Sequence, residues 1–474
     1  MSELHERTAL ELHQSLQRGE VSPVELATHY LERVERLNPE VGAFVEVTGE
    51  RALERARLVE REVPRSRPLW GLPLGDKDLQ QRAGVPARFG SRAFADFVPD
   101  TSDDLVQAVD AAGAVSLGKT ATPEFGLPSY TEGLSGPPAR NPWDLGLGAG
   151  GSSGGAAAAV AAGLLPFAPG SDGGGSIRIP AAACGLVGVK PSRGRVPGGS
   201  GLGSLAGLGV AGPIARTVAD AALLLDGLIG PEGYPAAHPF AVRAPGDDGP
   251  YLGAAVRGEG RFQLGVLTES PWDEGYDISI APEARAALDR AIAVLDTGRH
   301  GIEEVPAAPE PGYPEAFRTI WQAGAATIPV DGEGLELLEP LTQWLVERGR
   351  ALPARQLAEA LSWLSAFERR VIARFASYDA VLTPALALTP RPVGWYDARD
   401  GERNFAQQVQ FTPFTSFVNV SGLPAITVPV EFTAEGLPMG VQLIGRPGGE
   451  ATLFSLAAQL ERRLRRAPRH PALW

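Results

Sequence analysis

Two glycine-serine segments decide how this chain is interpreted: residues 150–155 read GGSSGG, and residues 172–176 read DGGGS. Glycine runs let backbone N–H groups approach a ligand closely, because no side chain stands in the way. The second segment leads into IRIPAAA at 177–183, where we expect a helix to begin. Loop amides at the start of a helix favour bound negative charge. A serine placed there can attack a carbonyl while neighbouring amides hold the oxyanion, so Ser176 is a candidate nucleophile.

The segments around these loops alternate between strand and helix patterns. The expected elements are a strand ending at Lys77, a helix at 103–112, a strand at 114–117, a helix at 154–162 and a strand at 164–168. Later, residues 425–432 and 439–444 flank a turn and predict a hairpin, and 450–464 predict an amphipathic helix. Alternation of this kind is typical of layered α/β proteins. The expected fold class is therefore α/β, with a mixed, largely parallel central sheet covered by helices.

The rest of the chain supports one domain, because we find no repeat and no long linker. Capping-box patterns at Thr8 and Ser22 predict two helices, the second ending at Asn38-Pro39. Stretches rich in Gly, Pro and Asp at 231–275 and 304–315 are expected to form loops. Within the single domain 1–474 we distinguish N-terminal helices at 1–67, a catalytic core at 68–230, a variable substrate-shaping region at 231–410, and a hairpin and helix completing the core at 411–474.

Composition and charge exclude several classes of function. The 474 residues carry 56 acidic and 43 basic side chains, a net charge of −13, which argues against nucleic acid or an anionic membrane as partner. Cys184 is the only cysteine, so cysteine zinc clusters and intrachain disulfides are excluded, and no metal or organic cofactor is implied. Without a leader pattern or an apolar run of about 18 residues, we expect a cytoplasmic protein.

Lysine is rare in this chain. Among 43 basic residues only Lys77, Lys119 and Lys190 are lysines. GC-rich coding explains the general bias toward arginine. A buried lysine can lose its proton, whereas arginine effectively cannot, so the pattern raises the chance that one of the three acts in chemistry.

Three competing motifs fail on their context. Residues 146–151 match the G-x-G-x-x-G dinucleotide pattern, but they follow a turn rather than a buried strand. Residues 151–155 match the nucleophile elbow G-x-S-x-G, but none of the six histidines lies in an obvious motif. Residues 116–119 match the β-lactamase S-x-x-K pattern, but the companion motifs are missing.

Taken together, the motifs closely resemble those of the amidase signature family. The segments that carry the resemblance are GGSSGG at 150–155, GSDGGGSIRIPAAACG at 170–185 and GVKP at 188–191, flanked by GLPLGDKD at 71–78, GKT at 118–120, PEFG at 123–126, NPW at 141–143, GPIAR at 212–216 and GLPA at 422–425. The likeness covers roughly residues 5–230 and 378–464. It implies an α/β/α sandwich and an amide hydrolase.

The resemblance also implies a Ser–cis-Ser–Lys triad. Ser176 takes the position of the nucleophile, Ser152 that of the bridging serine after a cis peptide bond, and Lys77 that of the base. The expected oxyanion hole consists of the backbone amides of Gly173, Gly174, Gly175 and Ser176. A neutral lysine would take the proton of Ser176 through Ser152 and return it to the leaving nitrogen. Since free lysine has a pKa of about 10.4, burial must lower it.

Several neighbours of the triad are expected to support it. Ser153 is assigned as a hydrogen-bonding support, and Asp172 and Arg178 as a pair that braces the nucleophile loop. Asp76 stands where the family usually has a small or apolar residue, and strand geometry predicts that it points away from the lysine. Gly173 replaces a residue that is often Thr or Ile, which predicts a looser loop. Lys119 and Lys190 are interpreted as structural.

The leading hypothesis is a hydrolase that cleaves a small, apolar aryl or alkyl carboxamide through an acyl-enzyme. Its expected substrate contacts are Phe125, Gly126, Leu127 and Trp321. An aminohexanoate-oligomer or carbamate hydrolase is an alternative within the same family. Relatives of this kind are often dimers, so a homodimer is allowed, but no residue pattern fixes the assembly.

A second alternative is the A-type subunit of the glutamine-dependent tRNA transamidation complex. That relative is expected to carry a Tyr-rich glutamine-recognition segment, whereas residues 313–324 here are apolar. A catalytically dead scaffold is disfavoured, because all three triad residues are present.

Overall fold

The fold is built on one large mixed sheet, seen in a computed structural model that describes residues 3–196, 204–229, 250–464 and 469–474. In spatial order its strands are β10 (Gly301–Glu304), β9 (Gln263–Val266), β11 (Ala380–Pro384), β13 (Pro438–Gly445), β12 (Ala425–Phe432), β7 (Val187–Lys190), β8 (Val210–Ala215) and β6 (Phe167–Asp172). A smaller sheet has the order β1 (Phe44–Val47), β3 (Val115–Thr120) and β2 (Pro73–Lys77), and β2 also contacts β6.

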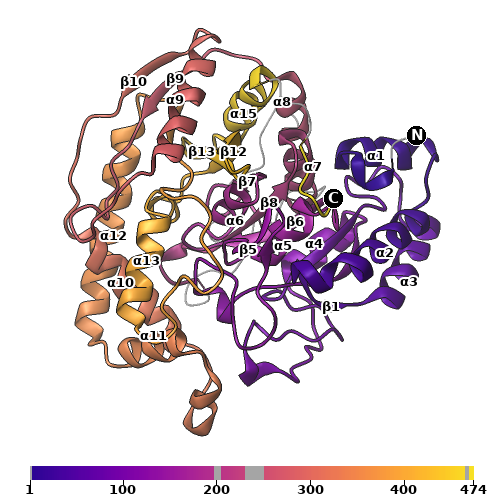
Figure 1. The fold of residues 1–474 in the computed structure, drawn as a ribbon, viewed down its shortest axis with the longest axis horizontal. Helices are drawn as coiled ribbons and strands as arrows, with labels where there is room; N and C mark the ends of the chain where they lie inside the picture. Colours follow the sequence, from indigo (N-terminus) through magenta and orange to yellow (C-terminus); the bar gives the residue numbers. More distant parts are fainter. Residues whose placement is uncertain (1–2, 197–203, 230–249, 465–468) are drawn as a thin grey trace.

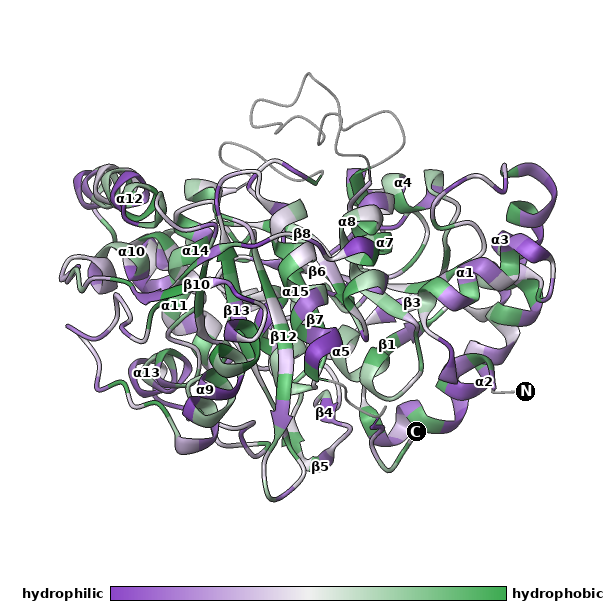
Figure 2. Cartoon of the chain, turned by 90° about the horizontal axis from the view of Figure 1, so that it is seen from above, coloured by the Kyte–Doolittle hydropathy of each residue, from purple (hydrophilic) through white to green (hydrophobic). Residues whose placement is uncertain are grey.

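Helices surround this sheet (Figures 1 and 2). They are α1 (Ala9–Arg18), α2 (Pro23–Val41), α3 (Gly49–Glu62), α4 (Asp104–Ala111), α5 (Gly154–Ala161), α6 (Arg178–Ala183), α7 (Val218–Ile229), α8 (Tyr251–Arg257), α9 (Pro282–Asp296), α10 (Tyr313–Ala326), α11 (Pro340–Arg350), α12 (Ala354–Phe375), α13 (Gly401–Phe411), α14 (Ser416–Val420) and α15 (Glu450–Leu464). The N-terminal helices α1 to α3 lie at one end of the molecule, and α10 to α13 lie at the other.

The predicted mixed α/β sheet covered by helices is confirmed. Parallel pairing joins β10 to β9, β9 to β11, and β2 to β3. The other neighbours in the large sheet run antiparallel, including the predicted hairpin of β12 and β13. Parallel pairing is therefore less extensive than the alternation of strands and helices predicts.

Local predictions were correct at most elements, and three of the differences are described next. Helix α2 continues through Pro39 to Val41 and ends at Gly42 with φ 66°, because a proline in the last turn removes a single helical hydrogen bond. Strand β6 begins at Phe167, three residues later than predicted. The Leu164 N–H donates to a carbonyl of the preceding helix, and Pro166 has no N–H, so neither residue can donate to the sheet. Residues 263–266 of the predicted loop at 231–275 form β9, and 251–257 form α8.

The variable region is part of the main sheet rather than a separate insertion. Strands β9, β10 and β11 all come from residues 231–410 and extend the sheet beyond β13. The predicted boundary at 230/231 and the loop residues 231–249 lie outside the described residues. Helices α10 and α13 of the same region reach back toward the second glycine-serine loop, which makes the region suited to shaping a substrate cavity.

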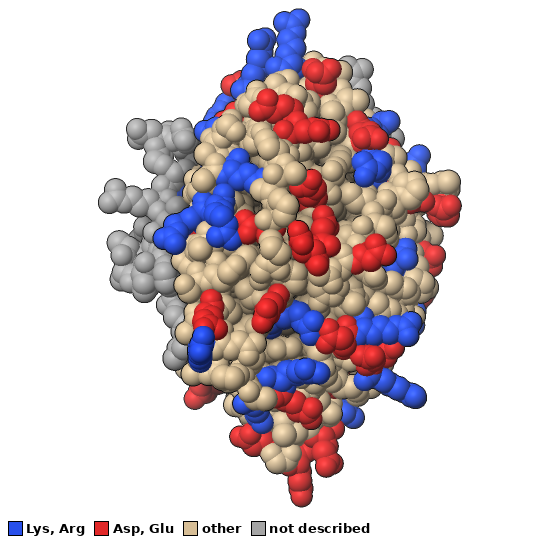
Figure 3. Space-filling model, turned by 90° about the vertical axis from the view of Figure 1, so that its left-hand side faces the viewer, with Lys and Arg blue, Asp and Glu red and all other residues tan. Residues whose placement is uncertain are grey.

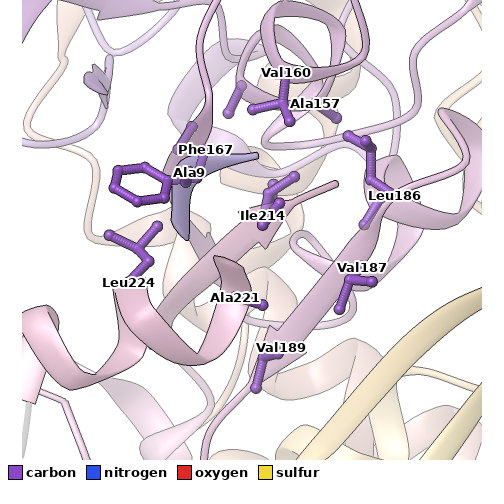
Figure 4. Packing of buried hydrophobic residues seen from close by; sticks show 14 of the residues in the cluster. Ala9, Ala157, Val160, Phe167, Leu186, Val187, Val189, Ile214, Ala221 and Leu224 are labelled. Carbon is purple, nitrogen blue, oxygen red and sulfur yellow. The ribbon is translucent and has the colours of Figure 1, made fainter. Parts of the chain in front are cut away.

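The helix after the first glycine-serine loop packs closely on the sheet. Residues 156–162, which form most of α5 and its C-terminal cap, are all buried. All of them except Val160 are alanines. Small side chains let a helix approach its neighbours closely. Figure 4 shows Ala157 and Val160 near Phe167 of β6 and Ile214 of β8, and these elements are in contact. This packing fixes the start of the helix, and hence residues 150–153, beside β6.

The outer surface carries charges of both signs. Figure 3 shows acidic and basic side chains interspersed on the face at the left-hand side of Figure 1, so that face has no single sign of charge. In the described ranges no helix combines the length and the apolar character needed to span a bilayer.

Two buried carboxyl groups join the 124–134 segment to helix α11. Glu339 caps this helix, is 9% exposed, and accepts a hydrogen bond from the Leu134 N–H at 3.0 Å. The fully buried Glu124 accepts from the Glu339 N–H at 2.7 Å and from Ser91 Oγ at 2.6 Å. Burial, and then the neighbouring Glu124, raises the pKa of Glu339 to about 7.

We expect this raised pKa to lower the free energy of unfolding as the pH rises. Between the unfolded value of 4.5 and about 7 the folded state holds the extra proton, so stability is lost as the pH rises through this window. Glu339→Gln removes the ionisation and should stabilise the protein at pH 8 by up to about 3 kcal/mol, with little effect at pH 4.5. Denaturant unfolding at both pH values measures the difference, and an equal effect at both would contradict the assignment.

Candidate active site

Lys77 is the last residue of β2, and its side chain is fully buried. The strand carries its amine to the two glycine-serine loops. Nζ donates to Ser152 Oγ at 2.8 Å and to Ser171 Oγ at 3.0 Å, with a longer contact of 3.4 Å to the Ser171 carbonyl. All of these partners are uncharged oxygens, so the lysine has hydrogen bonds without a direct ion pair among them.

The protonation of this amine is set by its burial. Loss of water lowers the pKa of Lys77 to about 7, and the carboxylate of Asp172 opposes the shift. An amine with this pKa is uncharged in about half of the molecules at neutral pH. A general base works best when its pKa lies near the working pH, so this lysine is suited to accept a proton.

Ser152 lies in the loop before α5, and its side chain is 2% exposed. The Gly151–Ser152 peptide bond is cis, as the family resemblance implies. Ser153 supports the loop from the other side: its hydroxyl donates to the Ser171 carbonyl at 3.2 Å and accepts from the Ser171 N–H at 3.3 Å. These contacts agree with the supporting position predicted for Ser153.

Ser176 lies at the end of the second loop, just before α6, and is 7% exposed. Its carbonyl accepts a hydrogen bond from the Ser153 N–H at 3.1 Å, which joins the two glycine-serine loops. Ser152 and Ser176 are both among the described residues, and their hydroxyl groups form no hydrogen bond to each other. The side chains of Lys77 and Ser152 are therefore in direct contact. Ser176 is joined to the Ser152 loop by the backbone hydrogen bond from Ser153.

Of the four backbone N–H groups at residues 173–176, three are free among the described residues and one is occupied. Within the described part of the chain, the N–H groups of Gly173, Gly174 and Ser176 have no acceptor. The Gly175 N–H donates to Asp172 Oδ1 at 2.7 Å, so it is not free to hold an oxyanion. This differs from the prediction of four available amides, because the carboxylate of the preceding turn occupies one of them.

The predicted pairing of Asp172 with Arg178 is confirmed. Both side chains are fully buried, and two nitrogens of the guanidinium, Nε and Nη2, each donate to one carboxylate oxygen at 2.9 Å. The Asp172 carboxylate also accepts from the Ile177 N–H at 3.2 Å. Although burial acts in the other direction, Arg178 holds the pKa of Asp172 well below its usual range. The ionised carboxylate thus fixes the backbone on both sides of Ser176.

Residues from the end of the chain complete this brace, and sequence reasoning missed them. Asn419 Nδ2 donates to the carbonyl and to Oδ1 of Asp172, both at 2.8 Å. Arg178 donates to Gln442 Oε1 at 2.6 Å and to the Thr415 carbonyl at 3.0 Å. They lie more than 230 residues from the loop in sequence, so no local spacing points to them.

Thr415 also explains why residue 175 must be glycine. Its hydroxyl donates to the Gly174 carbonyl at 2.7 Å. A Cβ added at Gly175, where φ is 133°, would lie 2.4 Å from this hydroxyl. The close approach is open only to glycine.

The charged neighbours of the site have partners of their own. Asp76 Oδ2 accepts from Arg82 Nε at 2.6 Å and from Ser116 Oγ at 2.7 Å, which agrees with the prediction that it points away from Lys77. Lys119 pairs with Asp78 at 3.1 Å. Lys190 is fully buried and donates to the Pro191 carbonyl at 3.0 Å. These contacts support a structural interpretation of Lys119 and Lys190.

A largely apolar cavity opens beside Ser176. Its lining comprises Leu127, Pro128, Ser129, Gly174, Ser176, Ile179, Trp272, Phe317, Trp321, Phe405, Gln408, Val409, Thr412 and Ser416. None of these described residues is charged. Six of the fourteen come from residues 231–410: Phe317 and Trp321 of α10, Phe405, Gln408 and Val409 of α13, and Trp272.

Of the four predicted substrate contacts, Leu127 and Trp321 line the cavity, whereas Phe125 and Gly126 do not. Phe125 instead packs in a cluster of phenylalanines, and Gly126 lies against the bridging serine, where an added Cβ would be 3.2 Å from Ser152 Oγ. The ring of Trp321 covers the glycine loop, 3.6 Å from a Cβ placed on Gly173. The looseness predicted from Gly173 is thus offset by an aromatic ring packed on it.

The chain has relatives among known sequences and structures. The amidase family matches residues 25–454. A putative amidase from Synechocystis sp. is 36% identical over 463 residues, which are 96% of this chain and 88% of the relative. The A-type subunit of glutamyl-tRNA(Gln) amidotransferase from Nitratidesulfovibrio vulgaris is 34% identical, with 98% of each chain covered.

The solved structure of a 6-aminohexanoate cyclic dimer hydrolase in complex with its substrate superposes with a TM-score of 0.89 at 31% identity, covering 99% of this chain and 100% of that one. The fold is therefore shared with an amide hydrolase, and the similarity to amidases extends over nearly the whole length of the chain. The chain belongs to the amidase family and is a hydrolase that acts on amides.

Proposed function

We propose that this enzyme cleaves the C–N bond of amides through an acyl-enzyme on Ser176. The observation that carries the proposal is the 2.8 Å hydrogen bond between the buried amine of Lys77 and Ser152 Oγ. A lysine with a pKa near 7 can accept a proton, and the hydroxyl of Ser152 can relay one. The free amides of Gly173 and Gly174 lie next to the nucleophile and can receive the oxyanion.

In the first half-reaction, Ser176 Oγ attacks the amide carbon while its proton passes to Ser152, and the proton of Ser152 passes to Lys77. The carbonyl oxygen becomes an oxyanion that accepts hydrogen bonds from the free amides. As the C–N bond breaks, the proton returns along the same path to the leaving nitrogen. Water then attacks the ester by the same route and releases the carboxylic acid. Every step uses protein groups and water.

The proposed relay needs a hydrogen bond between the hydroxyls of Ser152 and Ser176, which we expect to form when substrate binds. Catalytic hydrogen bonds often tighten when substrate binds. The substrate carbonyl, held by the loop amides, would bring Ser176 into position for this bond.

The lining of the cavity supports an uncharged, apolar substrate. Trp272, Phe317, Trp321 and Phe405 supply aromatic walls, and no lining residue among those described is charged. A charged substrate would lose its hydration there without gaining a partner. Aryl and alkyl carboxamides are therefore the preferred class.

Two alternatives have specific support. The sequence likeness to the A-type subunit of an amidotransferase favours a glutaminase, but the charged ends of glutamine find no opposite charge in the described cavity lining. The structural likeness to a 6-aminohexanoate cyclic dimer hydrolase favours a cyclic amide, which has no charged ends and suits the apolar walls. A carbamate differs from an amide by one additional oxygen on the carbonyl carbon, and its carbonyl would bind the same amides of the nucleophile loop.

The proposal is tested by trapping the covalent intermediate. The enzyme is mixed with an anilide, a linear alkyl amide, a cyclic diamide, a carbamate and glutamine, and then quenched in acid. Intact-protein and peptide mass spectrometry should find the acyl group on the peptide that contains Ser176. Substrate turnover without any acyl adduct on this residue, even at the earliest quench times, would contradict the mechanism.

Trp321 is expected to limit the size of the substrate group beside the glycine loop. Its ring stacks on Phe317 at 5.5 Å and lies over Gly173 and Gly174. Trp321→Ala opens this space, so the kcat/KM ratio of bulky over small anilides should rise by about 10-fold or more. Initial rates with a series of anilides measure the ratio.

The matched control is Trp363→Ala, since Trp363 is also half-buried but lies on α12, outside the cavity lining. An equal change of preference in both variants would show that the effect is not local.

A further inference from the structure

One loop contacts both the substrate cavity and the bridging serine. Residues 127–129 line the cavity. On the other side, Gly126 lies close to Ser152, and a Cβ added at Gly151 would lie 2.6 Å from the backbone of Tyr130. We call residues 126–131 the bridging loop. Because it fills the space against the Gly151–Ser152 peptide, its position sets where Ser152 lies.

Thr131 fastens the bridging loop to both ends of the serine segment. Its Oγ1 donates to the Gly150 carbonyl at 2.9 Å and accepts from the Gly154 N–H at 3.2 Å. The side chain is 4% exposed, so water does not compete strongly for these bonds. A displacement of the bridging loop would thus be passed to the residues on either side of Ser152.

Gln408 of α13 holds the same loop from the cavity wall. Its Oε1 accepts from the Ser129 N–H at 2.8 Å, and its Nε2 donates to Asn404 Oδ1 at 2.7 Å. Asn404 in turn donates to the hydroxyl of Tyr130 at 2.8 Å, and the Tyr130 ring stacks on Tyr396 at 4.0 Å. Helix α13 therefore binds the bridging loop at two consecutive residues.

We propose that Gln408 is a positioning residue for the catalytic relay: its bond to Ser129 fixes the bridging loop, which holds Ser152 against the amine of Lys77. The inference rests on the proposed function, because it assumes that the contact between Lys77 and Ser152 carries the proton. Gln408 also lines the cavity, so the residue that fixes the relay is one that a bound substrate meets. The structure in this way links the substrate-shaping helix to the base.

The test compares Gln408→Met with Gln407→Met. Both glutamines are half-buried on α13 and make two hydrogen bonds each; those of Gln407 go to the Asp397 N–H and the Trp395 carbonyl, both at 2.8 Å. Methionine keeps the length of the side chain and removes its polar atoms. We expect kcat to fall about 10- to 100-fold in Gln408→Met, with KM nearly unchanged, and to fall less than about 3-fold in Gln407→Met.

The pH profile supplies a readout that a merely structural role would not move. A loosened bridging loop admits water to Lys77 and raises its pKa toward the ordinary value, since burial is what lowers it. The acid limb of kcat/KM should therefore move up by about one pH unit in Gln408→Met and stay in place in Gln407→Met.

Thr131→Val provides a second route to the same result, because it keeps the shape of the side chain and removes both bonds to the serine segment. We expect it to lower kcat and shift the limb in the same direction. If Gln408 acts through the bridging loop, the double variant should be little worse than the more impaired single variant. Thermal unfolding of all variants identifies any that fail to fold, and Thr131→Val then carries the test.

Equal effects of Gln408→Met and Gln407→Met would overturn the proposal. A rise in KM with unchanged kcat and an unmoved acid limb would also overturn it and would make Gln408 a substrate contact. Failure of the proposed function is separate, since it would appear as undiminished turnover in a variant without the Ser176 hydroxyl.

Discussion

Replacing Ser176 by alanine is expected to lower kcat for amide hydrolysis by at least about 1,000-fold, because the attacking oxygen is lost while the free loop amides remain. The side chain is small and makes no hydrogen bond within the described structure that holds the fold, so the variant should unfold at nearly the temperature of the parent. Product release from an anilide, followed over hours at high enzyme concentration, measures the residual rate.

Ser153→Ala is the matched control for this experiment. Its hydroxyl contacts Ser171 rather than the cavity, so we expect a loss of about 10-fold at most. A rate in Ser176→Ala close to that of the parent would show that another group attacks the substrate.

Lys77→Met should lower kcat/KM by a similar amount, because among the described residues no other side chain is hydrogen-bonded to Ser152 Oγ to take its proton. Lys77→Arg should not restore activity, since arginine stays charged at every accessible pH. The comparison separates loss of the base from loss of side-chain volume. Steady-state kinetics of both variants test the prediction, and substantial activity in Lys77→Arg would exclude proton transfer to this position.

The pH dependence of the parent enzyme follows from the same amine. In the proposed relay the neutral amine is the active form, and the pKa of Lys77 lies near 7 in the folded state. As the pH falls below this value the amine is protonated, and kcat/KM should drop about 10-fold per pH unit. Above pH 8 the rate should be level until another group titrates.

Lys190 is the control for this profile, since burial lowers its pKa to about 7 as well. It donates to the Pro191 carbonyl and does not line the cavity, so Lys190→Met should leave the limb in place. If the acid limb of kcat/KM disappeared in Lys190→Met, the titrating group would be Lys190 rather than Lys77.

The sequence was most informative where function depends on local spacing. The second glycine run identifies Ser176 as a candidate nucleophile, and the family resemblance adds Ser152 and Lys77 to the expected site. The structure places Lys77 and Ser152 in contact, as the family resemblance implies. Asp172 and Arg178 pair for the same reason: they are six residues apart in one loop.

Groups that reach the site from distant segments could not be predicted in this way. Asn419 and Gln442 have no local pattern that distinguishes them from other buried polar residues, and only the tertiary fold brings them, from α14 and β13, to the loop. Ser171 was also missed, although it neighbours Asp172 and contacts the lysine directly. Alternation of strands and helices likewise overestimated parallel pairing: consecutive strands pair antiparallel at β7–β8 and β12–β13, and the distant strands β7 and β12 also run antiparallel.

The brace between Asp172, Arg178, Asn419 and Gln442 has a consequence for biosynthesis. A ribosome-bound chain that has emerged only as far as residue 410 already contains the lysine and both serines, yet lacks the last two of these four groups. In such a nascent chain the paired carboxylate and guanidinium of the nucleophile turn lack the hydrogen bonds that Asn419 and Gln442 supply. Hydrolytic competence should therefore arise only after residue 442 has emerged, so that a shorter nascent chain is inactive.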